Sequence, residues 1–129
     1  LKGAIWDVVV DLRKGSKTFG GWFGSTLSEE NRTMMYVPEG LAHGFVTLEP
    51  ESEILYLVSN FYSPESEGTL LWNDPDVAIN WPVTPELLSD TKTVSPYRSS
   101  LQASDASCGS RRIMTLGVCT WKRSAILIL

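Results

Sequence analysis

Histidine and cysteine are scarce in this chain of 129 residues, which has one histidine, His43, and two cysteines, Cys108 and Cys119. A metal centre in a β-barrel normally takes two or three histidines and a carboxylate, so a single histidine argues against a metal site. One cysteine pair does not make a disulfide scaffold, and the residues ahead of Cys108 contain no cysteine. A reducing, cytoplasmic setting is therefore expected.

Several sequence signals of other protein classes are also missing. No serine or cysteine stands in a strained elbow motif, and no glycine-rich loop precedes a helix, so neither a hydrolytic triad nor a phosphate loop is indicated. The apolar end, residues 125–129, is far shorter than the ~20 residues that a membrane-spanning helix needs. The chain begins with Leu1 and enters a strand pattern at once, so we expect a fragment that has lost its beginning.

The charge is divided unevenly along the chain. Residues 1–96 carry 6 basic and 14 acidic side chains, and residues 97–129 carry 5 basic and 1 acidic. An acidic body argues against nucleic acid as the partner, because phosphate contacts require clustered lysine and arginine. We therefore expect a domain over 1–96 and a divergent basic tail over 97–129, which is rich in serine, lacks a clear apolar period and is expected to be poorly ordered or loosely packed.

The body consists of short β-type segments separated by glycine and proline, with no convincing amphipathic helix. This pattern predicts an antiparallel all-β domain, and it does not choose among a sandwich, a barrel and a jelly roll. In one of these segments Ile54, Tyr56 and Val58 share a face, which predicts that Tyr56 points inward. The expected segments are residues 4–12, 18–27, 32–37, 42–48, 52–59 and 69–72, with an edge segment at 78–82.

His43 and Tyr56 are the residues best suited to chemistry. Imidazole titrates near neutral pH and the tyrosine hydroxyl is a weak acid, so the two together can handle a sugar or keto substrate without a metal. Taken alone, each residue has a structural explanation that is more common, because a lone histidine is usually satisfied by backbone at a turn and a lone tyrosine usually packs in a core. The four tryptophans of the body are likewise expected in core and rim packing rather than as stacking platforms.

The surrounding motifs favour a site. They include Pro38-Glu39-Gly40-Leu41-Ala42-His43-Gly44-Phe45 and Trp72-Asn73-Asp74-Pro75, together with residues 3–13, 16–20, 27–31, 61–67 and 79–82. In order and spacing these motifs resemble the dTDP-4-dehydrorhamnose 3,5-epimerase family, over about residues 2–90. The resemblance implies a cupin-like antiparallel jelly roll that is incomplete at its N-terminus and has a poorly structured C-terminal tail.

The family resemblance also implies an activity. It is the cofactor-independent and metal-free epimerisation of dTDP-4-dehydro-6-deoxyglucose at C3 and C5, by an isomerase of deoxysugar nucleotide biosynthesis that is a homodimer in its full-length form. By motif position Tyr56 matches the family's catalytic acid, His43 a histidine that contacts the substrate, and Glu67 a glutamate that contacts the nucleotide-sugar. The implied partner is a dTDP-linked keto-deoxysugar, with no nucleic acid and no membrane.

The chain departs from the family at two motifs. The family's base histidine belongs to an N-terminal Arg-Gly-Leu-His-like motif followed by a lysine, and neither is present in these 129 residues. Thr91 and Lys92 stand where a later Ser-x-Lys-Asp motif has lysine and aspartate. We therefore expect little or no turnover from these residues alone. The alternatives are a non-catalytic nucleotide-sugar binding module and a related keto-sugar isomerase or mono-epimerase.

Overall fold

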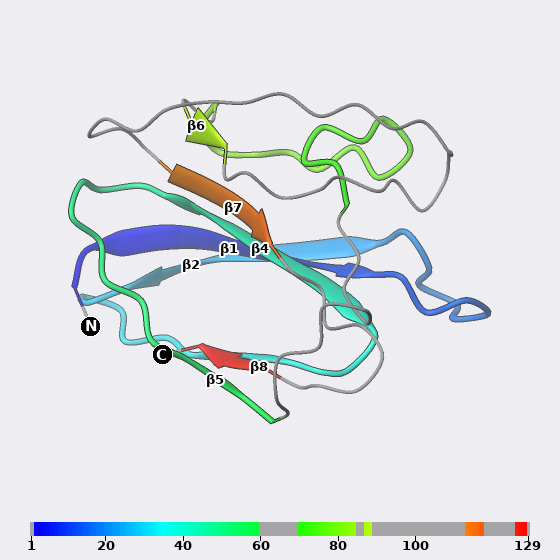
Figure 1. The fold of residues 1–129 in the computed structure, drawn as a ribbon, viewed down its shortest axis with the longest axis horizontal. Helices are drawn as coiled ribbons and strands as arrows, with labels where there is room; N and C mark the ends of the chain where they lie inside the picture. Colours follow the sequence, from blue (N-terminus) through cyan, green and yellow to red (C-terminus); the bar gives the residue numbers. More distant parts are fainter. Residues whose placement is uncertain (1, 60–69, 85–86, 89–112, 118–125, 129) are drawn as a thin grey trace.

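The fold consists of two β-sheets, seen in a computed structural model that describes residues 2–59, 70–84, 87–88, 113–117 and 126–128. No helix, and so none that could span a membrane, occurs in these ranges. This confirms the all-β prediction. The strands are β1 (Ala4–Asp11), β2 (Trp22–Ser28), β3 (Met35–Val37), β4 (Leu41–Thr47), β5 (Tyr56–Val58), β6 (Leu87–Leu88), β7 (Ile113–Gly117) and β8 (Ile126–Ile128) (Figure 1).

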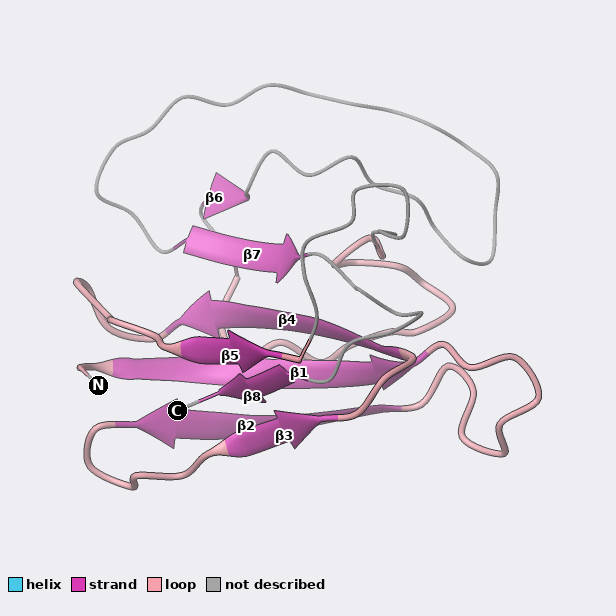
Figure 2. Cartoon of the chain, turned by 60° about the horizontal axis from the view of Figure 1, so that its bottom comes forward, coloured by secondary structure: helices cyan, strands magenta, loops and turns pink. Residues whose placement is uncertain are grey.

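The larger sheet has the order β2-β1-β4-β7-β6, and the smaller sheet has the order β3-β8-β5. All neighbouring strands run antiparallel except β6 and β7, which are parallel. The smaller sheet lies across one face of β2, β1 and β4 (Figure 2). Both sheets therefore present one face to a shared interior.

Strand β1 is the centre of the larger sheet. Its sequence is rich in β-branched residues, which suit a pleated and buried backbone. Side chains alternate between the two faces of a strand, and both faces of β1 are buried, with Val8 and Val10 on one and Ile5 and Asp7 on the other. Strands that are buried on both faces usually have near-continuous apolar sequences, so Asp7 in the middle of β1 is an exception.

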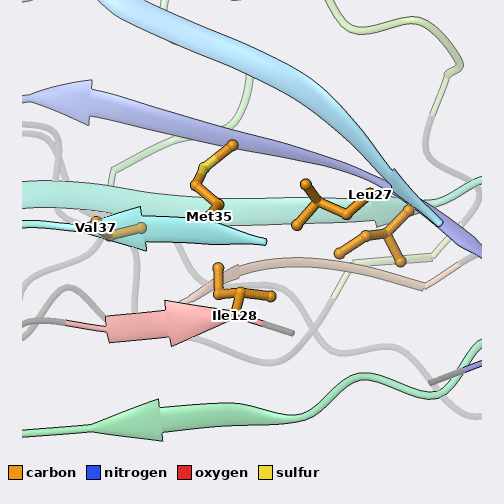
Figure 3. Packing of buried hydrophobic residues seen from close by; sticks show 5 residues of the cluster. Leu27, Met35, Val37 and Ile128 are labelled. Atoms are coloured by element: carbon orange, nitrogen blue, oxygen red, sulfur yellow. The ribbon is translucent and has the colours of Figure 1, made fainter. Parts of the chain in front are cut away.

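The shared interior holds one of the apolar clusters. Ile5 of β1 and Leu27 of β2 pack there against the smaller sheet, with Val9, Leu41, Phe45 and Ile54 around them. Figure 3 shows how the smaller sheet fills this space from below with Met35, Val37 and Ile128. The cluster joins residues from both ends of the chain, so the C-terminal residues are part of the core.

The opposite face of the larger sheet is covered by residues 70–84. Val10 and Ala42 pack there against Leu70 and Val77, and Val46 packs among tryptophans. Trp6 makes edge-to-face contacts with Trp22 and Trp81, with ring centroids 6.1 and 5.1 Å apart. These contacts agree with the expected packing role of the tryptophans. Leu70–Trp72 and Ala78–Pro82 form no strand, unlike the expectation, and the covering segment is held by turns.

The structure shortens two other expected strands. Within the expected segment 32–37 the strand is Met35–Val37, and within 52–59 it is Tyr56–Val58. Residue 53, ahead of the second strand, makes only an isolated bridge with Lys2. After residue 96 the described residues are 113–117 and 126–128, which form β7 and β8. Residues 89–112 and 118–125 lie outside the described part.

The turn after β1 is fastened by a second aspartate, Asp11. Its carboxylate accepts hydrogen bonds from Arg13 Nε at 2.9 Å and Nη2 at 2.8 Å, and from the hydroxyls of Ser16 and Thr18, both at 2.6 Å. The Arg13 side chain, followed by the two hydroxyls, holds the pKa of Asp11 well below its ordinary value. Asp11 is therefore an ionised structural group that orders residues 13–18.

Candidate functional site

The only histidine of the chain is paired with a buried carboxylate. His43 Nε2 lies 2.9 Å from Oδ1 and 3.0 Å from Oδ2 of Asp7. The hydrogen bond is directed at Oδ2, and Oδ1 has no hydrogen-bond partner among the described residues. Asp7 is 0% exposed and the His43 side chain 13%. The ring of His43 is therefore bonded to a side chain, and the expectation that backbone at a turn satisfies it is wrong.

The strand register explains how the pair forms from residues 36 positions apart. Strands β1 and β4 are antiparallel, with Asp7 opposite Phe45 and Val9 opposite His43. Asp7 and His43 are thus diagonal neighbours on one face, a separation that long side chains can bridge. The same face carries Ile5, which belongs to the shared interior. Asp7 and His43 therefore face the space between the two sheets.

Burial dominates the electrostatics of Asp7. Removing the carboxylate from water raises its pKa above the ordinary value, and the hydrogen bond and charge of His43 act in the opposite direction with smaller effect. When Asp7 is ionised it fixes the imidazole by accepting from Nε2. Nδ1 is then the nitrogen left to meet a ligand. A carboxylate-oriented imidazole in a dry environment is a common arrangement for polarising or protonating a carbonyl compound.

Tyr56 lies on the other sheet. It is opposite Ile128 in the register of β5 and β8, so the two residues share a face of the smaller sheet. Ile128 faces the shared interior, as does the His43–Asp7 pair across from it. Tyr56 thus lies on the inward face, as alternation predicted, although it is 60% exposed. The structure thus places Tyr56 and His43 on facing sheets without a direct bond between them.

Sequence reasoning missed Asp7, which is the partner of His43. A signal was present, because an acidic side chain in the middle of Ile5-Trp6-Asp7-Val8-Val9 is costly to bury unless it has a partner. Glu67, the third expected site residue, lies outside the described residues. Within the described ranges no group of three or more histidine, cysteine, aspartate or glutamate residues is arranged to hold a metal ion.

A cavity of about 320 Å³ opens elsewhere, at the end of the interior where β1 begins. Ile5, Leu27 and Ile54 form its apolar part, and Lys2, Glu29 and Arg32 are among its polar residues. None of Asp7, His43 and Tyr56 lines it. Its charges are mixed in sign and no chemistry converges there, so the His43–Asp7 pair remains the better candidate site.

Comparison with known proteins agrees with the motifs. The family model described as dTDP-4-dehydrorhamnose 3,5-epimerase matches residues 1–100. The Salmonella typhimurium protein of that name is 54% identical over 87 residues, which cover 66% of this chain and 48% of that protein. The Pseudomonas aeruginosa protein of the same name is 44% identical over 106 residues, covering 82% of this chain and 56% of that protein. The chain thus spans about half the length of these curated relatives.

Solved structures show the same likeness in the fold. The dTDP-4-dehydrorhamnose 3,5-epimerase of Elizabethkingia anophelis is similar with a TM-score of 0.57 and 43% identity, covering 65% of this chain and 46% of that one. The dTDP-6-deoxy-D-glucose-3,5-epimerase of Legionella pneumophila, solved in complex with dTDP-4-keto-L-rhamnose, has a TM-score of 0.56 and 39% identity, covering 65% of this chain and 45% of that one. The cupin-like all-β fold is thereby confirmed. The family model, the relatives and the structures agree, and the chain belongs to the dTDP-4-dehydrorhamnose 3,5-epimerase family.

Proposed function

We propose that this chain is part of an enzyme that converts dTDP-4-dehydro-6-deoxyglucose into dTDP-4-dehydro-L-rhamnose by epimerisation at C3 and C5. The observation that carries the proposal is the His43–Asp7 pair, which faces the interior of a fold shared with this family. The Legionella relative, in complex with dTDP-4-keto-L-rhamnose, supports a ligand of this class.

The reaction requires proton transfer next to a ketone. A proton is removed from the carbon beside C4, the electron pair moves onto the C4 oxygen as an enolate, and a proton returns to the carbon from the opposite face of the ring. Each epimerisation therefore needs a base on one face, an acid on the other, and a donor that stabilises the enolate oxygen. No redox or group-transfer step is involved.

His43 is proposed as the donor at the substrate. With Nε2 held by Asp7, Nδ1 carries a proton toward the substrate when the ring is an imidazolium, and the ionised Asp7 balances that charge. A donor placed in advance at a developing oxyanion typically lowers the barrier by about 3–4 kcal/mol. Asp7 is then a positioning residue, because it acts through the imidazole.

Tyr56 is proposed as the acid that returns the proton, and Glu67 as a contact to the nucleotide-sugar, both by their motif positions. The position of Tyr56 supports this role, since Tyr56 shares with Ile128 the face of the smaller sheet that lies across the interior from the His43–Asp7 pair. Tyr56 is 60% exposed, so a ligand can reach this residue.

These residues alone are proposed to have little turnover, because the family's base motif does not occur in residues 1–129. The test is deuterium wash-in at C3 and C5 of the keto-sugar in heavy water, with the Salmonella relative as positive control. We expect wash-in by this chain to stay close to the rate without protein. Incorporation at a rate comparable to the relative would overturn the inactivity, and product analysis would then separate double epimerisation from mono-epimerisation.

We also propose that the full-length protein is a homodimer in the cytoplasm, and that the chain divides at residue 96 into a domain and a tail. Calorimetry with dTDP and with the keto-sugar addresses the non-catalytic alternative. A binding module would bind both ligands, and restoring the missing base motif would bring no turnover.

A further inference from the structure

The smaller sheet covers the interior face of the larger sheet unevenly. Ile5 on β1 and Leu27 on β2 are directly opposite each other, and both are buried in the apolar cluster of the shared interior. Val9 lies four residues further along the same face of β1 and is partly buried, whereas its partner on β2, Phe23, is 62% exposed. Phe23 belongs to none of the apolar clusters of the described residues. It thus lies on the interior face without being packed into it.

The strand register connects Phe23 with the His43–Asp7 pair. Val9 is opposite Phe23 on one side and opposite His43 on the other, so the three residues form one row on one face of three strands. Neighbouring strands lie about 4.8 Å apart, so the ends of the row are about 10 Å apart at the backbone. The His43 side chain is 13% exposed, against 62% for Phe23. The row therefore leads from the buried pair to solvent.

Position, more than exposure alone, marks Phe23 as a ligand contact. Single exposed apolar side chains are common on protein surfaces and need no explanation. Phe23, however, lies in the same row as the imidazole proposed to meet the substrate. On the other side of His43 the register places Gly117, which has no side chain. A ligand that is held at His43 and follows this row therefore meets the side chains of Val9 and then Phe23.

We propose that Phe23 is the residue on which the thymine base of the nucleotide-sugar stacks, with the keto-sugar at His43 and the nucleotide at the exposed end of the row. This rests on the proposed function, which supplies the ligand. Phenylalanine offers a flat apolar face with neither charge nor hydrogen-bonding group, and the base is the flat aromatic part of the ligand. Because His43 addresses the C4 oxygen, the sugar takes the buried end and the base is left for Phe23.

The test is calorimetric titration of dTDP into the 129-residue chain and its variants. Phe23→Ala should weaken dTDP binding at least fivefold, the lower end of what stacking on an aromatic side chain contributes per base. Phe23→Tyr keeps a flat ring and should bind dTDP as the unchanged chain does, whereas Phe23→Leu should bind as weakly as Phe23→Ala. Because Phe23 is exposed and lies outside the apolar clusters, these variants should keep the fold.

Tyr36→Ala is the matched control for the loss of an exposed aromatic ring. Tyr36 is 64% exposed, and it lies between Met35 and Val37 on β3, which are buried in the interior, so it points to the outer face of the smaller sheet. This variant should leave dTDP binding unchanged. A loss as large as that of Phe23→Ala would overturn the assignment of the stacking contact to Phe23.

The methyl group of thymine reports the contact directly. A methyl group held over an aromatic ring moves upfield in the proton NMR spectrum. The dTDP methyl signal should therefore move upfield on binding to the unchanged chain and to Phe23→Tyr, and it should not do so with Phe23→Ala or Phe23→Leu. An upfield shift that persists in Phe23→Ala would overturn the stacking.

Failure of the stacking and failure of the proposed function give different results. If the unchanged chain binds neither dTDP nor the keto-sugar nucleotide, the ligand class is wrong, and both proposals are overturned. If dTDP binds the unchanged chain and Phe23→Ala with the same Kd, the stacking alone is overturned. Binding to Phe23→Leu as tight as to Phe23→Tyr would likewise overturn it, because an apolar surface without a flat ring would then suffice.

Discussion

His43 Nε2 lies between the two carboxylate oxygens of Asp7, 2.9 Å from Oδ1 and 3.0 Å from Oδ2. The contact joins two neighbouring strands of the larger sheet, β1 and β4. It fixes the orientation of the only imidazole in the chain, and it keeps a buried carboxylate beside a group that can balance its charge. Both consequences lead to measurements.

Replacing Asp7 by asparagine should change how stability depends on pH. Burial raises the pKa of Asp7 in the folded state, so the folded protein holds this proton more tightly than the unfolded chain does. The stabilising contribution of Asp7 is complete below about pH 4 and is lost as pH rises through the folded pKa. Asparagine does not titrate. Urea unfolding followed by tryptophan fluorescence should therefore show the unchanged chain losing stability relative to Asp7→Asn as pH increases. Parallel pH curves would contradict this.

Asp11→Asn should show the opposite trend. Arg13, Ser16 and Thr18 lower the pKa of Asp11, so its contribution is present above about pH 4 and disappears as pH falls through the folded pKa. At pH 7 the substitution should cost about 1–3 kcal/mol of unfolding free energy, because a buried acceptor of charge-assisted hydrogen bonds is lost. The difference from the unchanged chain should shrink in acid. A difference that stays constant with pH would show that the ionised form is not what stabilises the turn.

Gly24→Ala tests the tryptophan cluster on the outer face of β2. A Cβ at residue 24 would overlap the ring of Trp6, which also contacts Trp22 and Trp81. The ring must move, and we expect a loss of about 1–3 kcal/mol of unfolding free energy. Thr26→Ala is the matched control, since residue 26 is exposed on the same face of the same strand. It should cost less than about 1 kcal/mol. Equal losses of unfolding free energy from the two substitutions would contradict an overlap between a Cβ at residue 24 and the Trp6 ring.

Tyr56→Phe tests the proposed acid in a form of the protein that turns substrate over. Removal of the hydroxyl should lower kcat for epimerisation by about 10²-fold or more, the usual scale for general acid catalysis. Tyr36→Phe is the matched control, because Tyr36 is an exposed tyrosine on β3 of the same sheet. It pairs with Leu127 rather than Ile128, and so points to the other face. Unchanged kcat in Tyr56→Phe would remove Tyr56 from the mechanism.

Local sequence patterns predicted the central strands well. The β-branched run at Ala4–Asp11 and the segment at Leu41–Thr47 form strands where apolar residues indicated them. The pairing of Asp7 with His43, 36 positions apart in sequence, could not be predicted in this way, because it depends on the register of β1 and β4. A shift of one residue would have turned either side chain to the opposite face. The acidic residue in an apolar run indicated that a partner existed, and the fold identified it.

The exposure of Tyr56 and the role of the last residues were harder to predict. Alternation placed Tyr56 on the right face of β5, but β5 lies at the edge of the smaller sheet, where its residues stay exposed. The tail has no clear apolar period, yet Ile128 is buried. A three-residue strand between two others leaves too short a pattern to detect, and its partners are set by tertiary packing alone.

The most direct test of the proposed site is the NMR signal of the His43 Cε1–H group, which is unambiguous because the chain has one histidine. The signal is followed in the 129-residue chain during titration with dTDP-4-dehydro-6-deoxyglucose, and glucose serves as the control. If His43 contacts the keto-sugar, the signal moves saturably with the nucleotide-sugar and stays fixed with glucose. A signal that does not move while calorimetry shows the nucleotide-sugar bound would contradict the placement of the His43–Asp7 pair in the substrate site.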